Sequence, residues 1–198
     1  HVRSRRQRQM CIRDRYVMLD KLKRNMQGAV YSLPLKMESG TMRVTKNPVY
    51  GQLYFSGLTG WQAGATQEGS IQRLRYTGEK GIYLKKAIAR AGRLELTFTE
   101  EVDPNSVDMD SFSATAWNYK WSKGYGSPTF KLSDPEVRGT DDWQVQRTKI
   151  TGGGKKLFVY IEELHPCHNL KFDFFLRGKN GAELSGPVYF TIHELPKG

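Results

Sequence analysis

The chain has 198 residues, of which 38% are hydrophobic and 26% are charged, so it can bury the core of one or two globular domains. No apolar run approaches the roughly 20 residues that a membrane-spanning helix needs. The formal net charge of +11 would ordinarily favour an anionic partner such as nucleic acid, but nearly half of it comes from the first fifteen residues.

Residues 1–15 resemble translated sequencing-library adapter, because the run RRQRQMCIRDR at residues 5–15 back-translates into adapter codons. This segment holds six arginines and one aspartate, a net charge of +5, and one of the two cysteines, Cys11. We expect it to be an artefact of metagenomic assembly with no part in the fold. The remaining 25 basic and 19 acidic side chains leave a net charge of +6, evenly spread, which is typical of a solvated surface.

Residues 16–80 are predicted to form part of a β-propeller blade. Residues 16–25 carry no clear pattern, whereas residues 28–34, 41–45, 52–56 and 70–76 are predicted strands separated by turns. Trp61 lies in a glycine-rich loop. Four short antiparallel strands fit one blade, and one blade cannot bury both of its faces. We therefore expect this region to need neighbouring blades that the chain lacks.

Residues 81–198 are predicted to form an immunoglobulin-like β-sandwich, following a polar, glycine-bearing connection at residues 76–81. Leu94, Leu96 and Phe98 alternate with polar residues, which indicates a half-buried strand. Further strands are predicted near residues 112–117, 143–151, 155–161, 170–174 and 188–192, with turns at residues 103–106, 152–154 and 180–181. The predicted fold class is thus all-β, a partial propeller blade followed by a sandwich.

Aromatic residues are the candidate ligand-binding positions. Trp117, Tyr119 and Trp121 are predicted to share one strand face, with Tyr125 close behind. Such a row either stacks on sugar rings or packs inward, and packing is the commoner case in a sandwich. Trp61 either lines a ligand-facing rim or plugs the blade. The binding candidates are therefore Trp61, Trp117, Trp121 and Tyr125.

The sequence predicts no catalytic, metal or cofactor site in this chain. The segment His165-Pro166-Cys167-His168 supplies too few ligands for zinc or copper and lacks the second cysteine of a haem c site. The carboxylate pairs at residues 100–101, 141–142 and 162–163 lie in turns or strand ends, where neighbouring side chains point apart. The aspartates at positions 103, 108 and 110 lack the spacing of an EF-hand, and residues 152–156 join two strands rather than a strand and a helix.

Two stretches resemble a known family. Residues 39–78 resemble the last blade of propellers in large secreted bacterial proteins similar to soluble quinoprotein glucose/sorbosone dehydrogenases. The residues that match are Met42-Arg43, Asn47-Pro48, 51–54, 60–62, Gly69 and 72–78. WNYKWSKGYGSP, at residues 117–128, resembles the immunoglobulin-like domain after such propellers, and residues 96–107 are similar to modules of bacterial surface-layer proteins.

The resemblance implies a C-terminal fragment of a periplasmic or extracellular bacterial protein. The parent's pyrroloquinoline quinone (PQQ), calcium or haem c would be bound elsewhere, and the partners here would be the missing blades of the same chain. The sandwich would be a non-catalytic accessory or docking domain. Alternatives are a carbohydrate-binding module that uses Trp117, Trp121 and Tyr125, a nucleic-acid-binding domain, or a part of an active-site rim built on Trp61.

Overall fold

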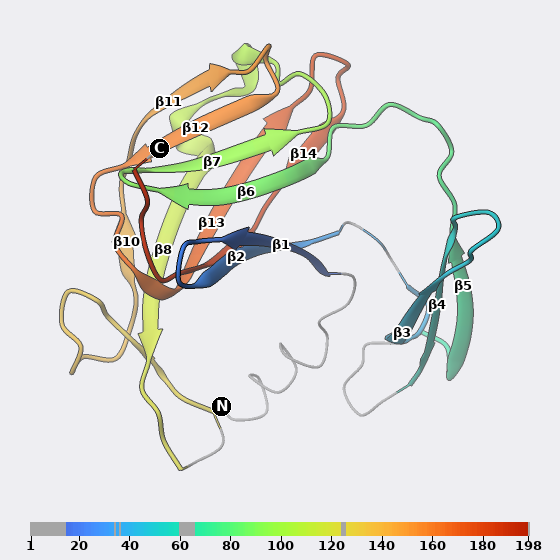
Figure 1. Ribbon diagram of the computed structural model, residues 1–198, viewed down its shortest axis with the longest axis horizontal. Helices are drawn as coiled ribbons and strands as arrows, with labels where there is room; N and C mark the ends of the chain where they lie inside the picture. Colours follow the sequence, from blue (N-terminus) through green and yellow to red (C-terminus); the bar gives the residue numbers. More distant parts are fainter. Residues whose placement is uncertain (1–14, 34, 36, 60–65, 124–125, 198) are drawn as a thin grey trace. The chain divides into compact units, whose positions relative to one another are not determined.

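The computed structural model describes residues 15–33, 35, 37–59, 66–123 and 126–197, which form two compact units (Figure 1). One unit lies within Ser32–Glu79, and the other joins Tyr16–Tyr31 to Lys80–Gly198. The described residues form antiparallel strands and two short 3-10 turns, Pro104–Ser106 and Met109–Ser111, and none of them is in an α-helix. The predicted all-β fold is confirmed. Within these ranges no helix is long and apolar enough to cross a membrane.

The larger unit is a sandwich of two antiparallel sheets. The first sheet runs in the order β1 (Arg15–Lys21), β2 (Met26–Ser32), β15 (Val188–Ile192), β13 (Cys167–Arg177), β8 (Phe112–Tyr119) and β10 (Asp141–Trp143). Two short strands extend it, since β9 (Thr129–Phe130) pairs with β8 and β14 (Glu183–Ser185) pairs with β13. The second sheet, in the upper part of Figure 1, runs in the order β11 (Val145–Thr151), β12 (Lys156–Ile161), β7 (Arg93–Phe98) and β6 (Leu84–Arg90).

The strand order of the sandwich matches that of the immunoglobulin fold. If strands A to G are β6, β7, β8, β11, β12, β13 and β15, the second sheet reads A-B-E-D and the first contains C-F-G. Strand β10 extends the sheet beyond C, and the hairpin of β1 and β2 extends it beyond G.

The sandwich core comes from strict alternation along the central strands. On β7, Leu94, Leu96 and Phe98 are buried, while the residues between them face outward. From the other sheet, Phe172 stacks on Phe112 with ring centroids 5.9 Å apart. Each such fully buried side chain contributes about 1.5–3 kcal/mol to folding. The core residues named here all belong to the larger unit.

The hairpin of β1 and β2 belongs to the sandwich, which differs from the predicted division of the chain at residue 80. Strand β2 pairs antiparallel with β15, with Ala29 opposite Phe190 and Tyr31 opposite Val188. Ala29 and Tyr31 are buried, as is Met18 on β1. The hairpin joins the sandwich because these apolar residues extend its core. The sequence alone places residues 28–34 in the blade, because the alternation of apolar residues does not reveal which sheet a strand joins.

The smaller unit is a three-stranded antiparallel sheet in the order β3 (Gly40–Lys46), β4 (Leu53–Leu58) and β5 (Gly69–Leu74). These strands match the predicted segments at residues 41–45, 52–56 and 70–76. Among the described strand residues of this sheet, only Phe55 is buried. The sheet therefore has very little core of its own.

Candidate functional site

The aromatic candidates Trp117 and Trp121 lie at and beyond the end of β8. Trp117 and Tyr119 face outward from the sheet, since they alternate with the buried Ala114 and Ala116. Trp121 lies two residues past the end of the strand and is 87% exposed. The predicted sites Trp61 and Tyr125 lie outside the described residues.

Contacts with β13 fix the aromatic end of β8. The Tyr119 ring stacks on His168 with centroids 6.4 Å apart, and the Tyr119 amide donates to Nδ1 of His168 at 3.0 Å. The amide of His168 donates to Oδ1 of Asn118 at 2.8 Å. Trp117 is half-buried, and its indole nitrogen has no hydrogen-bond partner among the described residues. These contacts thus hold Tyr119 in place, whereas Trp121 takes part in none of them.

The histidine and cysteine cluster is structural. Cys167 is buried at the start of β13, and this burial raises the pKa of its thiol to about 12. The His165 ring meets Trp143 edge-on at a centroid distance of 6.2 Å. His168 is engaged with Tyr119. No group of three or more potential metal ligands occurs in the part of the chain that the structure describes.

The acidic residues singled out in the sequence serve as caps and turn anchors. Asp103 and Asp108 accept hydrogen bonds from the backbone amides two residues on and so cap the two 3-10 turns. Burial alone would raise the pKa of Asp141, but hydrogen bonds from Ser133 and Leu132 lower it below its ordinary value. Glu101 pairs with a lysine, Lys179, at 2.6 Å. These carboxylates do not form an acid–base pair.

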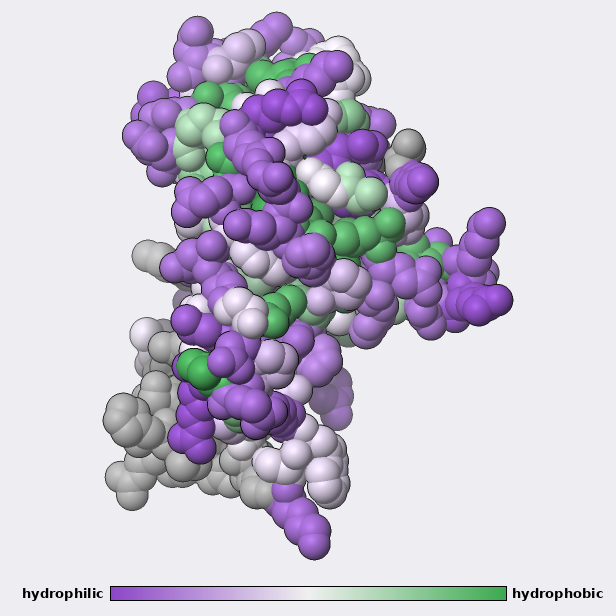
Figure 2. All heavy atoms as spheres, turned by 90° about the vertical axis from the view of Figure 1, so that its left-hand side faces the viewer, coloured by the Kyte–Doolittle hydropathy of each residue, from purple (hydrophilic) through white to green (hydrophobic). Residues whose placement is uncertain are grey.

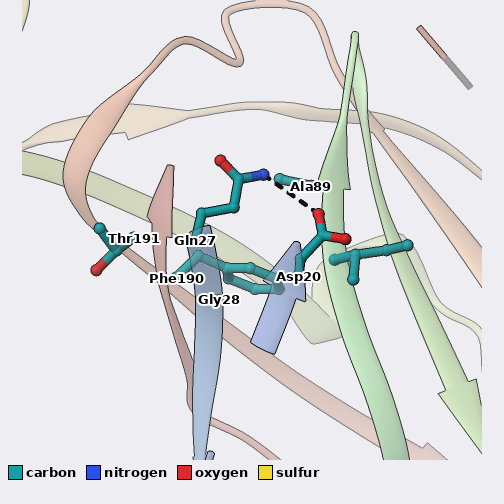
Figure 3. A pocket seen from close by; sticks show the side chains of 7 residues that line it. Asp20, Gln27, Gly28, Ala89, Phe190 and Thr191 are labelled. Carbon is teal, nitrogen blue, oxygen red and sulfur yellow. Dashed lines mark hydrogen bonds between the residues drawn. The ribbon is translucent and has the colours of Figure 1, made fainter. Parts of the chain in front are cut away.

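A buried polar cluster ties the β1–β2 hairpin to the rest of the sandwich. Asp20 on β1 accepts from Nη1 of Arg90 on β6 at 2.6 Å and from Nη2 at 3.2 Å. Gln27 on β2 donates to Asp20 at 3.4 Å, as drawn in Figure 3. The side-chain oxygen of Gln27 accepts from the backbone amides of His193 and Glu194. The hydrogen bond from Arg90 lowers the pKa of Asp20, although burial opposes this shift. The recess around the cluster has no room for a water molecule. We therefore interpret the polar cluster as a structural anchor.

A shallow groove of about 380 Å³ lies on the outer face of the larger sheet. Its apolar side comes from Val17, Leu19, Met26, Val30 and Tyr189, and its polar side includes Asn169, Thr191 and His193. Val17, Leu19 and Met26 are each more than half exposed. This groove is not evident from the sequence, because residues 16–25 carry no clear pattern and because three separate segments form it.

No protein-family model, curated protein or solved structure matches this chain.

Proposed function

We propose that this chain is the C-terminal part of a larger secreted bacterial β-propeller protein, in which the sandwich is a non-catalytic accessory domain. The sheet of β3, β4 and β5 then belongs to the last blade, and its partners are the preceding blades. The resemblance of residues 39–78 and 117–128 to quinoprotein glucose/sorbosone dehydrogenase-like proteins supports this assignment. Any PQQ, calcium or haem c belongs to the missing part, and the location is periplasmic or extracellular.

The exposed apolar side chains of the three-stranded sheet are the observation that carries the proposal. Val44 is 57% exposed and lies in register with Phe55 on one face, while Ile71 is 81% exposed and lies in register with Ser56 on the other. Met42 and Leu58 are also more than half exposed. A sheet with apolar residues on both faces needs a covering layer on each side, as a blade has within a propeller.

Hydrogen exchange followed by mass spectrometry tests this proposal. In the present chain, we expect amides of β4 to exchange at least about 100-fold faster than those of β7 and β13, because little buried surface protects β4. In a longer protein that includes the upstream blades, the amides of β4 should exchange more slowly, while the exchange rates of β7 and β13 stay unchanged. Slow exchange of β4 in the present chain would mean that this sheet needs no neighbours, and the proposal would fail.

Carbohydrate binding is a second candidate function, favoured by the exposure of two rings. Trp121 is 87% exposed and Tyr119 is 40% exposed, and both lie at one end of the sandwich. Exposed aromatic rings stack on the apolar faces of sugars. Affinity electrophoresis in neutral polysaccharides should then show retardation that Trp121→Ala abolishes. Equal mobility of the two proteins in every polysaccharide would exclude this function for Trp121.

A further inference from the structure

The outer face of the four-stranded sheet gathers basic side chains from all four of its strands. The register places Arg147, Tyr160 and Arg93 side by side, with Lys149, Phe158 and Glu95 in the next row. The basic residues of this face are Lys86, Arg90, Arg93, Arg147, Lys149 and Lys156. We call these six residues the basic face. Figure 2 shows hydrophilic residues over much of the visible surface, including the upper part, where this sheet lies in Figure 1.

Four of the six charges on the basic face make no ion pair with another described residue. Arg90 pairs with Asp20 at 2.6 Å, and Arg93 pairs with Glu95 at the same distance. The structure gives no ion pair to Lys86, Arg147, Lys149 or Lys156 within the ranges that it describes. Neighbouring strands are about 5 Å apart, and alternate residues along a strand are about 7 Å apart. The result is a two-dimensional array in which basic side chains outnumber acidic ones.

Aromatic rings hold two guanidinium groups of the basic face in place. Arg147 lies over the Tyr160 ring at 3.6 Å from its centroid, and Arg93 lies over Phe158 at 4.9 Å. Arg93 also donates to Glu95 at 2.8 Å, so its donors are already partly engaged. The Arg147 guanidinium keeps donors at its edge, which suit the two oxygens of a carboxylate or sulfate. Because the side chain is already ordered, less entropy is lost when it binds an anion. The basic face is therefore organised before any ligand arrives.

The opposite face of the sandwich lacks this excess of charge. There Lys171 pairs with Asp173 at 2.6 Å, and Asp142 accepts from Thr115 at 2.9 Å. Another part of that face carries the apolar groove. The positive array is thus confined to one sheet, although the basic residues look evenly spread along the sequence.

We propose that the basic face binds an acidic polysaccharide through the carboxylate or sulfate groups of successive sugars. A linear polyanion suits a flat array in which charges repeat in rows. Nucleic acid fits less well, because Arg147 and Arg93 already cover the rings of Tyr160 and Phe158 on which bases would stack. This site is separate from Trp121 and from the proposed contacts with propeller blades, so its test is independent of both.

Binding to polygalacturonate and to heparin, measured by isothermal titration calorimetry at low salt, tests the proposal. We expect Arg147→Glu/Lys149→Glu to weaken binding by roughly tenfold or more, because two charge-assisted contacts become repulsive. The matched control is Lys23→Glu/Arg24→Glu, an identical charge change at the exposed β1–β2 turn, which should change affinity less than about twofold. Neutral dextran should not bind. Circular dichroism and the melting temperature check that both variants fold.

Several results would overturn the proposal. One is an equal loss of affinity in the two double variants, since net charge alone would then explain binding. A second such result is that single-stranded DNA binds as tightly as either polysaccharide. A third is that neither polysaccharide binds. Residues 1–14 carry five arginines, so the comparison is repeated in a chain that begins at Arg15. The difference between the two double variants should persist there, and its disappearance would place the site in the removed segment.

Discussion

Asp20 shows how the stability of a hairpin can depend on one buried charge. It is 7% exposed on β1 and is satisfied by Arg90, seventy positions away in the sequence. A buried carboxylate is costly unless it is paired and hydrogen-bonded, so the hairpin is stable only where Arg90 and Gln27 are in place. Nothing within residues 16–25 reveals this partner, and the inward position of an aspartate obscures the strand pattern there.

Replacing Asp20 with asparagine should destabilise the sandwich by about 2 kcal/mol, because Arg90 then lacks a countercharge in a largely buried position. The matched control is Glu136→Gln, which breaks an equally short ion pair with Lys120 at an exposed site. That control should cost less than about 1 kcal/mol. Urea unfolding measures both values. Equal midpoints for the two variants would show that Asp20 does not anchor the hairpin.

The same ion pair predicts a pH dependence. The hydrogen bond from Arg90 lowers the pKa of Asp20 below its ordinary 3.8, so the folded state binds this proton more weakly than the unfolded state. The stabilisation is therefore complete well above pH 3.8 and is lost as the pH falls through that value towards the lower, folded pKa. Urea midpoints between pH 7 and pH 2.5 should fall less steeply for Asp20→Asn than for the unchanged chain.

Cys167 should be chemically inert in the folded protein. Burial raises the pKa of its thiol to about 12, so almost no thiolate exists at pH 8 and reagent cannot reach the sulfur. In a Cys11→Ser background, Ellman's reagent should label the native protein far more slowly than the urea-unfolded protein. Fast labelling without denaturant would mean that the start of β13 opens readily.

At the scale of elements, the sequence predicts those strands whose apolar residues alternate without a break. The pattern of Leu94, Leu96 and Phe98 identifies β7 and its inward face. The glycines at positions 152–154 all have positive φ and connect β11 to β12, as the hairpin prediction required. The basic face could not be predicted, because its lysines and arginines come from four strands. Only the register between those strands brings them together.

The β1–β2 hairpin depends on close backbone packing at Gly28. A Cβ atom at this position would lie 2.4 Å from the carbonyl oxygen of Met18 on β1, so Gly28→Ala requires backbone movement. We expect a loss of about 2 kcal/mol or more and faster hydrogen exchange in β1. Val30→Thr, a change on the outward face of the same strand, should cost less than about 1 kcal/mol. Unchanged exchange in Gly28→Ala would contradict this packing.

At the scale of the whole molecule, the chain enters the sandwich, leaves it to form the three-stranded sheet, and returns. Residues 16–31 and 80–198 form one unit, although 48 residues assigned to the other unit separate them in the sequence. The pairing of β2 with β15 and the Asp20–Arg90 ion pair are non-covalent contacts between these two segments. They should therefore hold the segments together even when the chain between them is cut. The two units are therefore expected to respond differently to proteolysis.

Brief digestion with trypsin should cut first at exposed basic residues of the smaller unit, such as Arg43 and Arg75. The fragment that contains β1 and β2 should still elute with residues 80–198 in size-exclusion chromatography, because strand pairing and the buried ion pair join them. It should dissociate at a lower urea concentration when Asp20→Asn is present. If the hairpin fragment elutes alone without denaturant, β1 and β2 do not belong to the sandwich, and the division at residue 80 read from the sequence is restored.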